Sequence, residues 1–199
     1  MHFSDLNLNK PLLKAIFEKN YETPTKVQIQ TIPLVLAKKN VIASAQTGTG
    51  KTAAFALPIL QLLFHQQDTN KEQKKIRALI VSPTRELAVQ INEEFTDYSK
   101  YTKLSSTVVY GGISIDAQKK VLKKGIDILI ATPGRLLDLC KQEIVDLSTI
   151  EILVLDEADL MLDMGFIDDI KKIDLLCPTQ KQILLFSATM PSKVVHFAK

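Results

Sequence analysis

The sequence predicts an α/β fold in which helices cover both faces of a doubly wound, mostly parallel sheet. Six short apolar runs, rich in Val, Ile and Leu, are nearly continuous rather than alternating, which is typical of strands buried on both faces. Stretches with helical spacing separate these runs, so strands and helices alternate along the chain. Polar or glycine-bearing motifs begin where the runs stop, and sheets of this kind bind ligands at the carboxyl ends of their strands.

The apolar runs and the periodic stretches give the bounds of the expected elements. The strands are expected at Val41–Ala45, Ala78–Val81, Thr107–Tyr110, Ile126–Ala131, Ile152–Leu155 and Ile183–Phe186. Apolar stripes at helical spacing are formed by Leu87, Ile91 and Phe95 and by Leu136, Leu137 and Cys140. Two more helices are expected before the first strand, at Lys10–Lys19 and Lys26–Ala37. Asn20 lies where the first of these would end in a left-handed residue.

Length and composition indicate one globular domain with a sizeable core. The chain has 199 residues, of which 46% are hydrophobic and 24% charged, and we find no repeat or linker. Its net charge of +3 permits a nucleic-acid partner without requiring one. Cys140 and Cys177 are expected to be free thiols in a reducing compartment. No secretory signal or membrane span is expected, which favours a cytoplasmic protein, and His65–Lys75 is expected to be a polar surface connection.

The segment Ala45–Thr52, which reads AQTGTGKT, is suited to binding the phosphates of a nucleotide. Gly48 and Gly50 allow a tight turn that directs several backbone N–H groups at one anion, and the following helix adds its positive end. Lys51 places a cation on the outer phosphates, and the Thr52 hydroxyl suits a Mg²⁺ ligand position. The alternative is a glycine turn followed by Lys and Thr by accident, which the strand before it and the helix after it disfavour.

The acidic run Asp156–Asp159 directly follows a buried strand. A carboxylate at that place needs a positive partner, which a Mg²⁺ ion on Asp156 would provide. Glu157 is placed to orient or deprotonate a hydrolytic water. Taken alone, the acids are equally explained as stabilising the N-terminus of the next helix. Together with the phosphate loop, they favour a nucleotide hydrolase.

Four further motifs follow expected strands. They are Pro83–Leu87, Gly111-Gly112, Thr132–Arg135 and Ser187–Thr189. Thr84 and Thr132 suit helix capping, which would be a structural role. Arg85 and Arg135 beside exposed helix N-termini at one sheet edge favour gripping of phosphodiester oxygens without reading of bases.

The order of these motifs resembles the first RecA-like domain of a DEAD-box RNA helicase. The resemblance rests on Tyr21–Gln28, AQTGTGKT, PTREL, GG, TPGR, DEAD and SAT, and it covers essentially the whole chain. The stretches Leu162–Phe166 and Thr132–Leu139 look most similar to the bacterial RhlE-like branch. The family's glycine before the aromatic residue is replaced here by Asn20, which tolerates the same turn.

The resemblance implies a role in ATP binding for the first motifs. Gln28 would read the adenine edge while Tyr21 packs on its face, with Phe3 and Thr25 beside them in a segment of about residues 1–38. The phosphates would be held by Gln46, Thr47, Gly48, Thr49, Gly50, Lys51 and Thr52. The catalytic residues would be Lys51, Asp156 and Glu157, with Mg²⁺ held by Thr52 and Asp156.

The resemblance also implies an RNA site and a second domain. RNA backbone contacts would come from Pro83, Thr84, Arg85, Gly111, Gly112, Thr132, Gly134 and Arg135. Ser187 and Thr189 would connect the nucleotide site to the RNA site. Family members carry a second RecA-like domain whose arginines reach the γ-phosphate, and its motifs are absent from this chain. Since an arginine finger contributes roughly 10³–10⁵ in rate, these residues alone are expected to bind adenine nucleotide but to be nearly inactive in hydrolysis.

Three other functions share some of these features. A small-molecule kinase would need an acceptor-binding segment and a lid, for which we find no signal. A GTPase would need an Asn-Lys-x-Asp motif, which does not follow the phosphate loop. Competition between ATP and GTP for binding would separate these enzyme classes. A non-catalytic RNA or protein platform would tolerate Lys51→Ala without loss of any activity.

Overall fold

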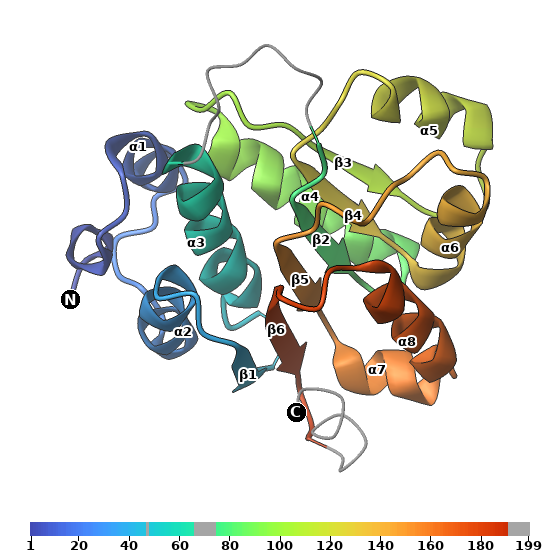
Figure 1. Ribbon diagram of the computed structural model, residues 1–199. Helices are drawn as coiled ribbons and strands as arrows, with labels where there is room; N and C mark the ends of the chain where they lie inside the picture. The colour runs from blue at the N-terminus through green and yellow to red at the C-terminus, as the bar shows by residue number, and fades with distance from the viewer. Residues whose placement is uncertain (47, 66–74, 191–199) are drawn as a thin grey trace.

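Six parallel strands form one sheet in the computed structural model, which describes residues 1–46, 48–65 and 75–190 (Figure 1). The strands are β1 (Val41–Ser44), β2 (Ala78–Val81), β3 (Ser106–Val109), β4 (Ile128–Ala131), β5 (Ile152–Leu155) and β6 (Gln182–Ser187). Their order in the sheet is β1-β6-β5-β2-β4-β3, and every pair of neighbours is parallel. The expected α/β fold is therefore confirmed, and the strand bounds agree with the expected ones to within two residues.

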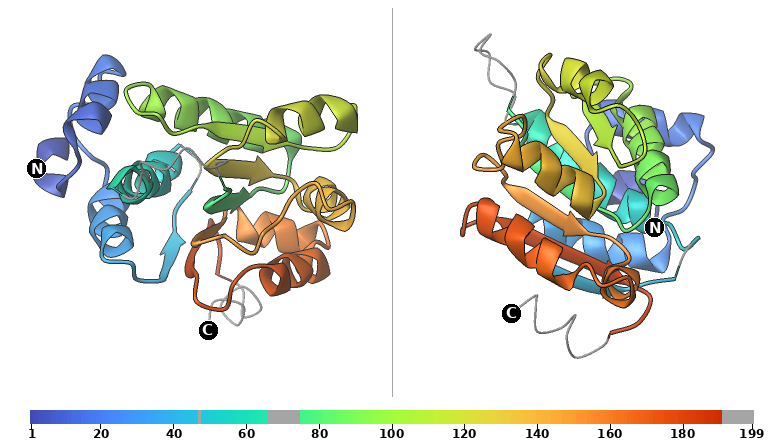
Figure 2. Two further views of the ribbon diagram at one scale, coloured as in Figure 1. Left: turned by 45° about the horizontal axis from the view of Figure 1, so that its top comes forward. Right: turned by 90° about the vertical axis from the view of Figure 1, so that its right-hand side faces the viewer.

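Helices cover both faces of the sheet, as the buried strands require (Figure 2). The helices on one face are α1 (Lys10–Glu18), α2 (Lys26–Leu36), α3 (Lys51–His65) and α4 (Arg85–Ser99), preceded by a short 3₁₀ helix η1 (Phe3–Leu6). Those on the other face are α5 (Ile115–Leu122), α6 (Pro133–Lys141), α7 (Ala158–Asp163) and α8 (Ile167–Leu176). Strand β2 shows the reason for the apolar runs, because Ala78 and Ile80 join one core while Leu79 and Val81 join the other.

The segment before β1 forms its two expected helices and packs onto the body of the domain. Asn9 caps α1 by accepting a hydrogen bond from the Leu12 amide at 3.1 Å. Asn20 has φ 57°, the left-handed conformation expected where this helix ends. Lys19 lies 2.5 Å from Asp97 of α4, and further polar contacts join the same two helices. These contacts attach the segment before β1 to α4.

The cysteines have the expected free state. Cys140 and Cys177 form no disulfide, and burial raises the pKa of Cys177 to about 12. A thiol with so high a pKa is almost entirely protonated at neutral pH and is a poor nucleophile.

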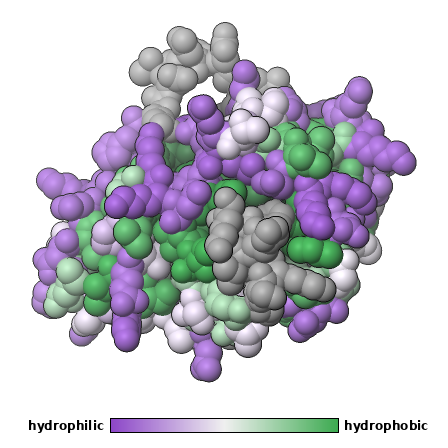
Figure 3. Space-filling model, turned by 60° about the horizontal axis from the view of Figure 1, so that its bottom comes forward, coloured by the Kyte–Doolittle hydropathy of each residue, from purple (hydrophilic) through white to green (hydrophobic). Residues whose placement is uncertain are grey.

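The molecular surface mixes polar and apolar patches. Figure 3 shows such a mixture on the face that lies at the bottom of Figure 1. Among the described residues, no helix combines the length and the apolar character needed to cross a membrane. The expected surface connection His65–Lys75 falls mostly on residues 66–74, which lie outside the described residues.

Candidate functional site

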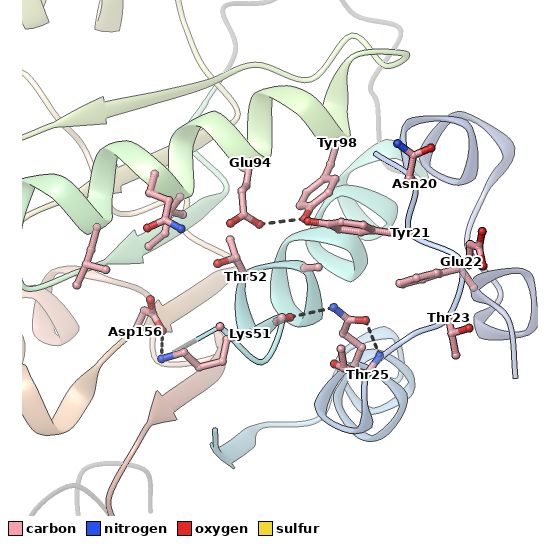
Figure 4. A pocket seen from close by; sticks show the side chains of 18 of the residues that line it. Asn20, Tyr21, Glu22, Thr23, Thr25, Lys51, Thr52, Glu94, Tyr98 and Asp156 are labelled. Carbon is pink, nitrogen blue, oxygen red and sulfur yellow. Dashed lines mark hydrogen bonds and ion pairs between the residues drawn. The ribbon is translucent and has the colours of Figure 1, made fainter. Parts of the chain in front are cut away.

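The two motifs most suited to nucleotide chemistry meet at the carboxyl edge of the sheet. Lys51 begins α3 directly after the loop that follows β1, and Asp156 directly follows β5. Only β6 lies between these two strands. As a result the Lys51 Nζ lies 3.7 Å from the Asp156 Oδ1, although the residues are far apart in sequence. Both side chains line a pocket of about 450 Å³, a size typical of small-molecule sites (Figure 4).

The loop after β1 adopts a backbone that requires glycine. Gly48 and Gly50 have φ 83° and 84°, in the left-handed region that other residues adopt only with strain. A Cβ on Gly50 would also lie 2.4 Å from the Gln28 Nε2, so any larger residue at this position would force the Gln28 side chain to move. The amide groups of the first turn of α3 have no acceptor within the helix and are suited to an anion. Thr47, which we expect in this loop, lies outside the described residues.

Two carboxylates surround the Lys51 ammonium in the pocket. Lys51 is 6% exposed, forms an ion pair with Glu157, and lies near Asp156. Glu157 starts α7 in the left-handed conformation, with φ 53°, which turns its side chain toward the loop. Burial raises the pKa of Asp156 to about 6, against the opposing effect of the Lys51 ammonium. Two acids against one ammonium leave an excess of negative charge that a divalent cation would neutralise.

The residues present fit a magnesium ion held partly by a nucleotide. The Asp156 Oδ1 is buried and has no hydrogen-bond partner in the part of the chain that the structure describes. Within that part there is no group of three or more His, Cys, Asp or Glu residues that would hold a metal alone. Mg²⁺ in nucleotide sites is commonly bound by one or two protein ligands together with water and phosphate oxygens. One buried carboxylate and no larger group of ligands therefore suit this ion.

The other end of the pocket is formed by the segment before β1. Gln28 is 3% exposed, and its Oε1 accepts a hydrogen bond from the Thr25 amide at 2.9 Å. Its Nε2 donates to the Gly50 carbonyl at 3.1 Å, which ties the segment to the phosphate loop. Tyr21 also lines the pocket and remains 40% exposed, while Phe3, another lining residue, is buried. A flat aromatic face beside a fixed amide is suited to a nucleobase.

The structure brings most of the expected nucleotide residues to one pocket. These are Phe3, Tyr21, Thr25, Gln28, Gly48, Gly50, Lys51, Thr52, Asp156 and Glu157. Gln46 and Thr49 stand in the same loop but do not line the pocket, and the Thr49 hydroxyl donates to the Gln46 carbonyl at 2.6 Å.

One wall of the pocket comes from α4, which sequence reasoning missed. The residues of this wall are Leu87, Gln90, Ile91, Glu94 and Tyr98. Gln90, Glu94 and Tyr98 are spaced four residues apart, beside the apolar stripe that predicted the helix. A polar stripe adjoining a buried apolar one was the available signal, but the sequence does not say what that stripe faces.

Asp159, the third acid of the run after β5, binds the motif after β6. The Asp159 amide donates to the Ser187 Oγ at 3.1 Å. The amide and the hydroxyl of Thr189 each donate to the Asp159 Oδ2 at 2.8 Å. Although partial burial opposes it, these hydrogen bonds hold the pKa of Asp159 below its usual value. Sequence reasoning had singled out Ser187 and Thr189 but had not assigned them this partner.

The expected RNA-binding motifs lie farther along the same edge, after β2, β3 and β4. The Arg85 guanidinium stacks 4.8 Å from the centre of the Tyr110 ring, a cation–π distance. The Arg135 Nη2 donates to the Ile113 carbonyl at 3.1 Å. Both arginines are thus held in place beside helix N-termini. None of the motif residues Pro83, Thr84, Arg85, Gly111, Gly112, Thr132, Gly134 and Arg135 lines the nucleotide pocket.

The two threonines expected to cap helices differ. The Thr84 Oγ1 accepts from the Leu87 amide at 3.3 Å and caps α4. Thr132 occupies the N-cap position of α6, but its side chain makes no capping hydrogen bond, so that expectation is wrong. Pro133 follows it in the first turn of α6, where its fixed φ suits a helix start without a capping side chain.

Known proteins resemble this chain over nearly its whole length. Residues 25–197 match the family model described as DEAD/DEAH box helicase. The DEAD-box ATP-dependent RNA helicase RhpA of Helicobacter pylori is 47% identical over 98% of this chain and 38% of its own length. The DEAD-box ATP-dependent RNA helicase CshA of Bacillus subtilis is 45% identical over 99% of this chain and 39% of its own.

A solved structure shows the same fold. The crystal structure of a DEAD box protein from Methanococcus jannaschii matches with a TM-score of 0.90 and 42% identity, covering 100% of this chain and 53% of that one. The chain therefore spans about half of that solved chain and less than two-fifths of the two curated relatives. The resemblance to a RecA-like domain of DEAD-box RNA helicases is confirmed, and the chain belongs to the DEAD/DEAH box helicase family.

Proposed function

We propose that this chain is the ATP-binding half of an ATP-dependent RNA helicase. The observation that carries the proposal is the 3.7 Å separation of the Lys51 Nζ from the Asp156 Oδ1 at the rim of a nucleotide-sized pocket. The names of the relatives and the family match support it.

In this proposal, residues 1–199 are one RecA-like domain, and residues 1–38 form its adenine-recognition segment. A second RecA-like domain lies outside these 199 residues and supplies the arginines of hydrolysis. The relatives, of which this chain covers about two-fifths, support that arrangement. Without such arginines, the loss of roughly 10³–10⁵ in rate leaves the 199 residues nearly inactive.

The residues of the pocket divide the work of ATP binding. Gln28 acts as both donor and acceptor of hydrogen bonds with the adenine edge, and Tyr21 covers the adenine face. The Lys51 ammonium contacts both Glu157 and Asp156 in the structure. It therefore leaves these two carboxylates when it moves onto the phosphates. Thr52 and Asp156 would hold Mg²⁺, which supplies neutralisation of phosphate charge when bound.

The departure of Lys51 frees Glu157 for catalysis. In the structure the Glu157 carboxylate forms an ion pair with the Lys51 ammonium. Once Lys51 is on the phosphates, Glu157 accepts a proton from the attacking water. Glu157 can therefore act as the base only when this ion pair is broken.

The motifs after β2, β3 and β4 would bind the RNA backbone, with Arg85 and Arg135 on phosphate oxygens. Backbone N–H groups and arginines of this kind position a strand without reading its bases. Asp159 would connect this surface to the nucleotide, because it joins the run after β5 to Ser187 and Thr189 of the next motif.

Two finer assignments belong to the same proposal. The stretches Leu162–Phe166 and Thr132–Leu139 support the bacterial RhlE-like branch, while the relatives reported above carry the names RhpA and CshA. A cytoplasmic location is supported by the two free thiols, which suit a reducing compartment.

The test is a turnover assay with the whole protein, in which these residues are joined to their second domain. Wild-type protein should hydrolyse ATP faster with RNA present, and excess GTP should compete poorly. Lys51→Ala should abolish turnover, whereas Lys141→Ala, which changes an exposed lysine at the end of α6, should not. RNA-independent turnover, or equal use of GTP, would contradict the proposal.

A further inference from the structure

Tyr110 lies at the carboxyl edge of the sheet, between the motifs that carry the two arginines. It directly follows β3 and precedes Gly111, and it belongs to none of the motifs. Alternation along β3 directs Tyr110 to the α4 face of the sheet, because Val108 packs against the core on that face and Val109 belongs to the other core. Strand β4 separates β3 from β2, so a contact between Tyr110 and the start of α4 spans the end of β4.

The Tyr110 ring makes that contact with the Arg85 guanidinium. The Arg85 Cζ lies 4.8 Å from the centre of the ring, within the range of a cation–π interaction. In the part of the chain that the structure describes, Arg85 forms no ion pair. The Tyr110 carbonyl accepts a hydrogen bond from the Gln118 Nε2 at 3.0 Å, and Gln118 is buried. The guanidinium therefore rests on a ring whose backbone is anchored to α5.

Both arginines of this edge lie where a positive charge is unfavourable. Arg85 is the first residue of α4, and Arg135 lies in the first turn of α6. The positive end of a helix dipole disfavours cations there, so neither place stabilises an arginine by itself. An anion bound at this edge would explain such a placement, because helix N-termini and guanidinium groups both bind phosphate oxygens. Arg135 also contacts the loop that begins with Tyr110, since its Nη2 donates to the Ile113 carbonyl at 3.1 Å.

An aromatic partner suits an arginine that binds an anion. A carboxylate partner would occupy the N–H donors of the guanidinium and would repel a phosphate group. The face of a tyrosine ring attracts the guanidinium through its negative quadrupole and carries no net charge. The contact therefore restricts the side chain and leaves its N–H groups available for phosphate oxygens.

We propose that Tyr110 is a positioning residue that holds the Arg85 guanidinium in place to bind a phosphate of the RNA backbone. The inference rests on the proposed function, because it assumes that Arg85 contacts RNA. A long side chain loses rotamer freedom when it binds a partner, and a side chain that is already restricted loses less. The ring therefore raises the affinity for RNA although Tyr110 itself contacts no nucleotide.

The experiment measures binding of this chain to a short fluorescent oligouridine by anisotropy, at a series of salt concentrations. Tyr110→Leu should weaken binding about two- to fivefold, the effect expected from loss of an exposed cation–π contact. The slope of log affinity against log salt concentration should become shallower by up to about 0.7, the value for one phosphate contact of a single strand. Tyr110→Leu removes no charge, so a shallower slope reports a lost phosphate contact, which a merely structural role would not change.

Two further variants are the controls. Tyr110→Phe keeps the face of the ring and should bind RNA nearly as wild type does. Tyr101→Leu is the matched control, since Tyr101 is also half-buried, lies at cation–π distance from a lysine, and stands just beyond the C-terminal end of α4. It should keep the wild-type affinity and slope. Wild-type binding by Tyr110→Leu, or equal losses in Tyr110→Phe and Tyr110→Leu, would overturn the inference.

A double substitution tests whether Tyr110 acts through Arg85. Arg85→Ala should weaken binding at least as much as Tyr110→Leu, and the double variant should lose no more than Arg85→Ala alone. Additive losses would overturn the inference, while an effect of Arg85→Ala would still support the proposed RNA site. Wild-type binding by Arg85→Ala, or no binding of RNA by the wild-type chain, would contradict the proposed RNA site and this inference with it.

A measurement without RNA guards against a folding defect in Tyr110→Leu. NMR relaxation of the Arg85 Nε–H group reports the fast motion of this side chain, which should be greater in Tyr110→Leu than in wild type or Tyr110→Phe. Arg135 is held by the Ile113 carbonyl instead, so its own Nε–H group should be unchanged and show that this edge is folded. Equal motion of Arg85 in wild type and Tyr110→Leu would overturn the inference.

Discussion

At the scale of single residues, the pocket holds one ammonium, that of Lys51, between two carboxylates. This ammonium faces Glu157 and Asp156, and all three side chains are nearly buried. A buried charge is costly unless it is paired, and one ammonium cannot fully compensate two carboxylates. Burial, with a smaller contribution from the neighbouring Glu157 carboxylate, raises the pKa of Asp156 against the opposing effect of the Lys51 ammonium. A cation that binds the Asp156 carboxylate would therefore replace the proton that the raised pKa favours.

The pKa of Asp156 gives a prediction about pH. Asp156 must be ionised to hold Mg²⁺, and burial raises its pKa to about 6. The gain in ADP affinity from Mg²⁺ should therefore decline as pH falls through about 6, and Asp156→Asn should reduce the gain and flatten this dependence. Calorimetric titrations at a series of pH values measure it. A gain that stays constant down to pH about 5 would contradict the prediction.

The same shift predicts the sign of an effect on stability without nucleotide. The folded chain keeps a proton on Asp156 that the unfolded chain has already released, between the ordinary pKa of 3.8 and about 6. The contribution of this group to the free energy of unfolding is therefore lost as pH rises through that window. Thermal melts of wild type and Asp156→Asn should converge at low pH, with the variant relatively more stable at neutral pH.

Substitutions at Gly48 and Gly50 separate the cost of backbone strain from the cost of a close contact. Both have a left-handed φ, but a Cβ on Gly48 would meet open space while one on Gly50 would meet Gln28. Gly48→Ala should show the cost of strain alone, about 1–2 kcal/mol. Gly50→Ala should lose more stability and also weaken adenine selectivity by displacing Gln28. Equal losses in denaturant titrations of the two variants would show that the contact is unimportant.

At the scale of helices, capping distinguishes two similar motifs. Thr84 accepts a hydrogen bond from the first turn of α4, and Thr132 makes none at α6. Thr84→Ala should cost about 1 kcal/mol in the free energy of unfolding, and Thr132→Ala clearly less. Chemical denaturation of both variants measures the difference. If Thr132→Ala costs as much, that threonine has a structural role that its side-chain contacts do not explain.

The sequence predicted helices and strands well because burial alone determines their patterns. The run Ala78–Val81 reads as a strand buried on both faces, and β2 has those bounds. Motif residues after strands were placed at one edge by a general property of parallel sheets. The failure at Thr132 has a physical reason, since a residue type permits a cap but the rotamer decides it.

Such patterns do not predict contacts between segments that are far apart in the sequence. No periodicity in the sequence says that α4 places Glu94 in the wall of the pocket that Thr52 also lines, or that Asp159 binds Thr189. The strand order β1-β6-β5-β2-β4-β3 was likewise not predicted, and it decides that the loop after β1 lies near Asp156. These arrangements follow from the packing of the whole chain.

At the scale of the whole molecule, one edge of the sheet carries two adjoining surfaces. The nucleotide pocket lies where β1, β6 and β5 end, and the arginine-bearing motifs lie where β2 and β4 end. Asp159 with Ser187 and Thr189 lies at the ends of β5 and β6, on the nucleotide side of this edge. The proposed function requires that these surfaces respond to each other, and the sheet order makes them neighbours.

The measurement that tests the central claim most directly is a calorimetric titration of this chain with ADP and Mg²⁺. The claim is that Lys51 and Asp156 bind phosphates and metal in one pocket whose far end recognises adenine. Wild-type chain should bind ADP, Lys51→Ala should bind it at least tenfold more weakly, as expected when a charged partner is removed, and GDP should compete poorly. Equal binding of ADP by wild type and Lys51→Ala, or equal affinity for ADP and GDP, would contradict the account.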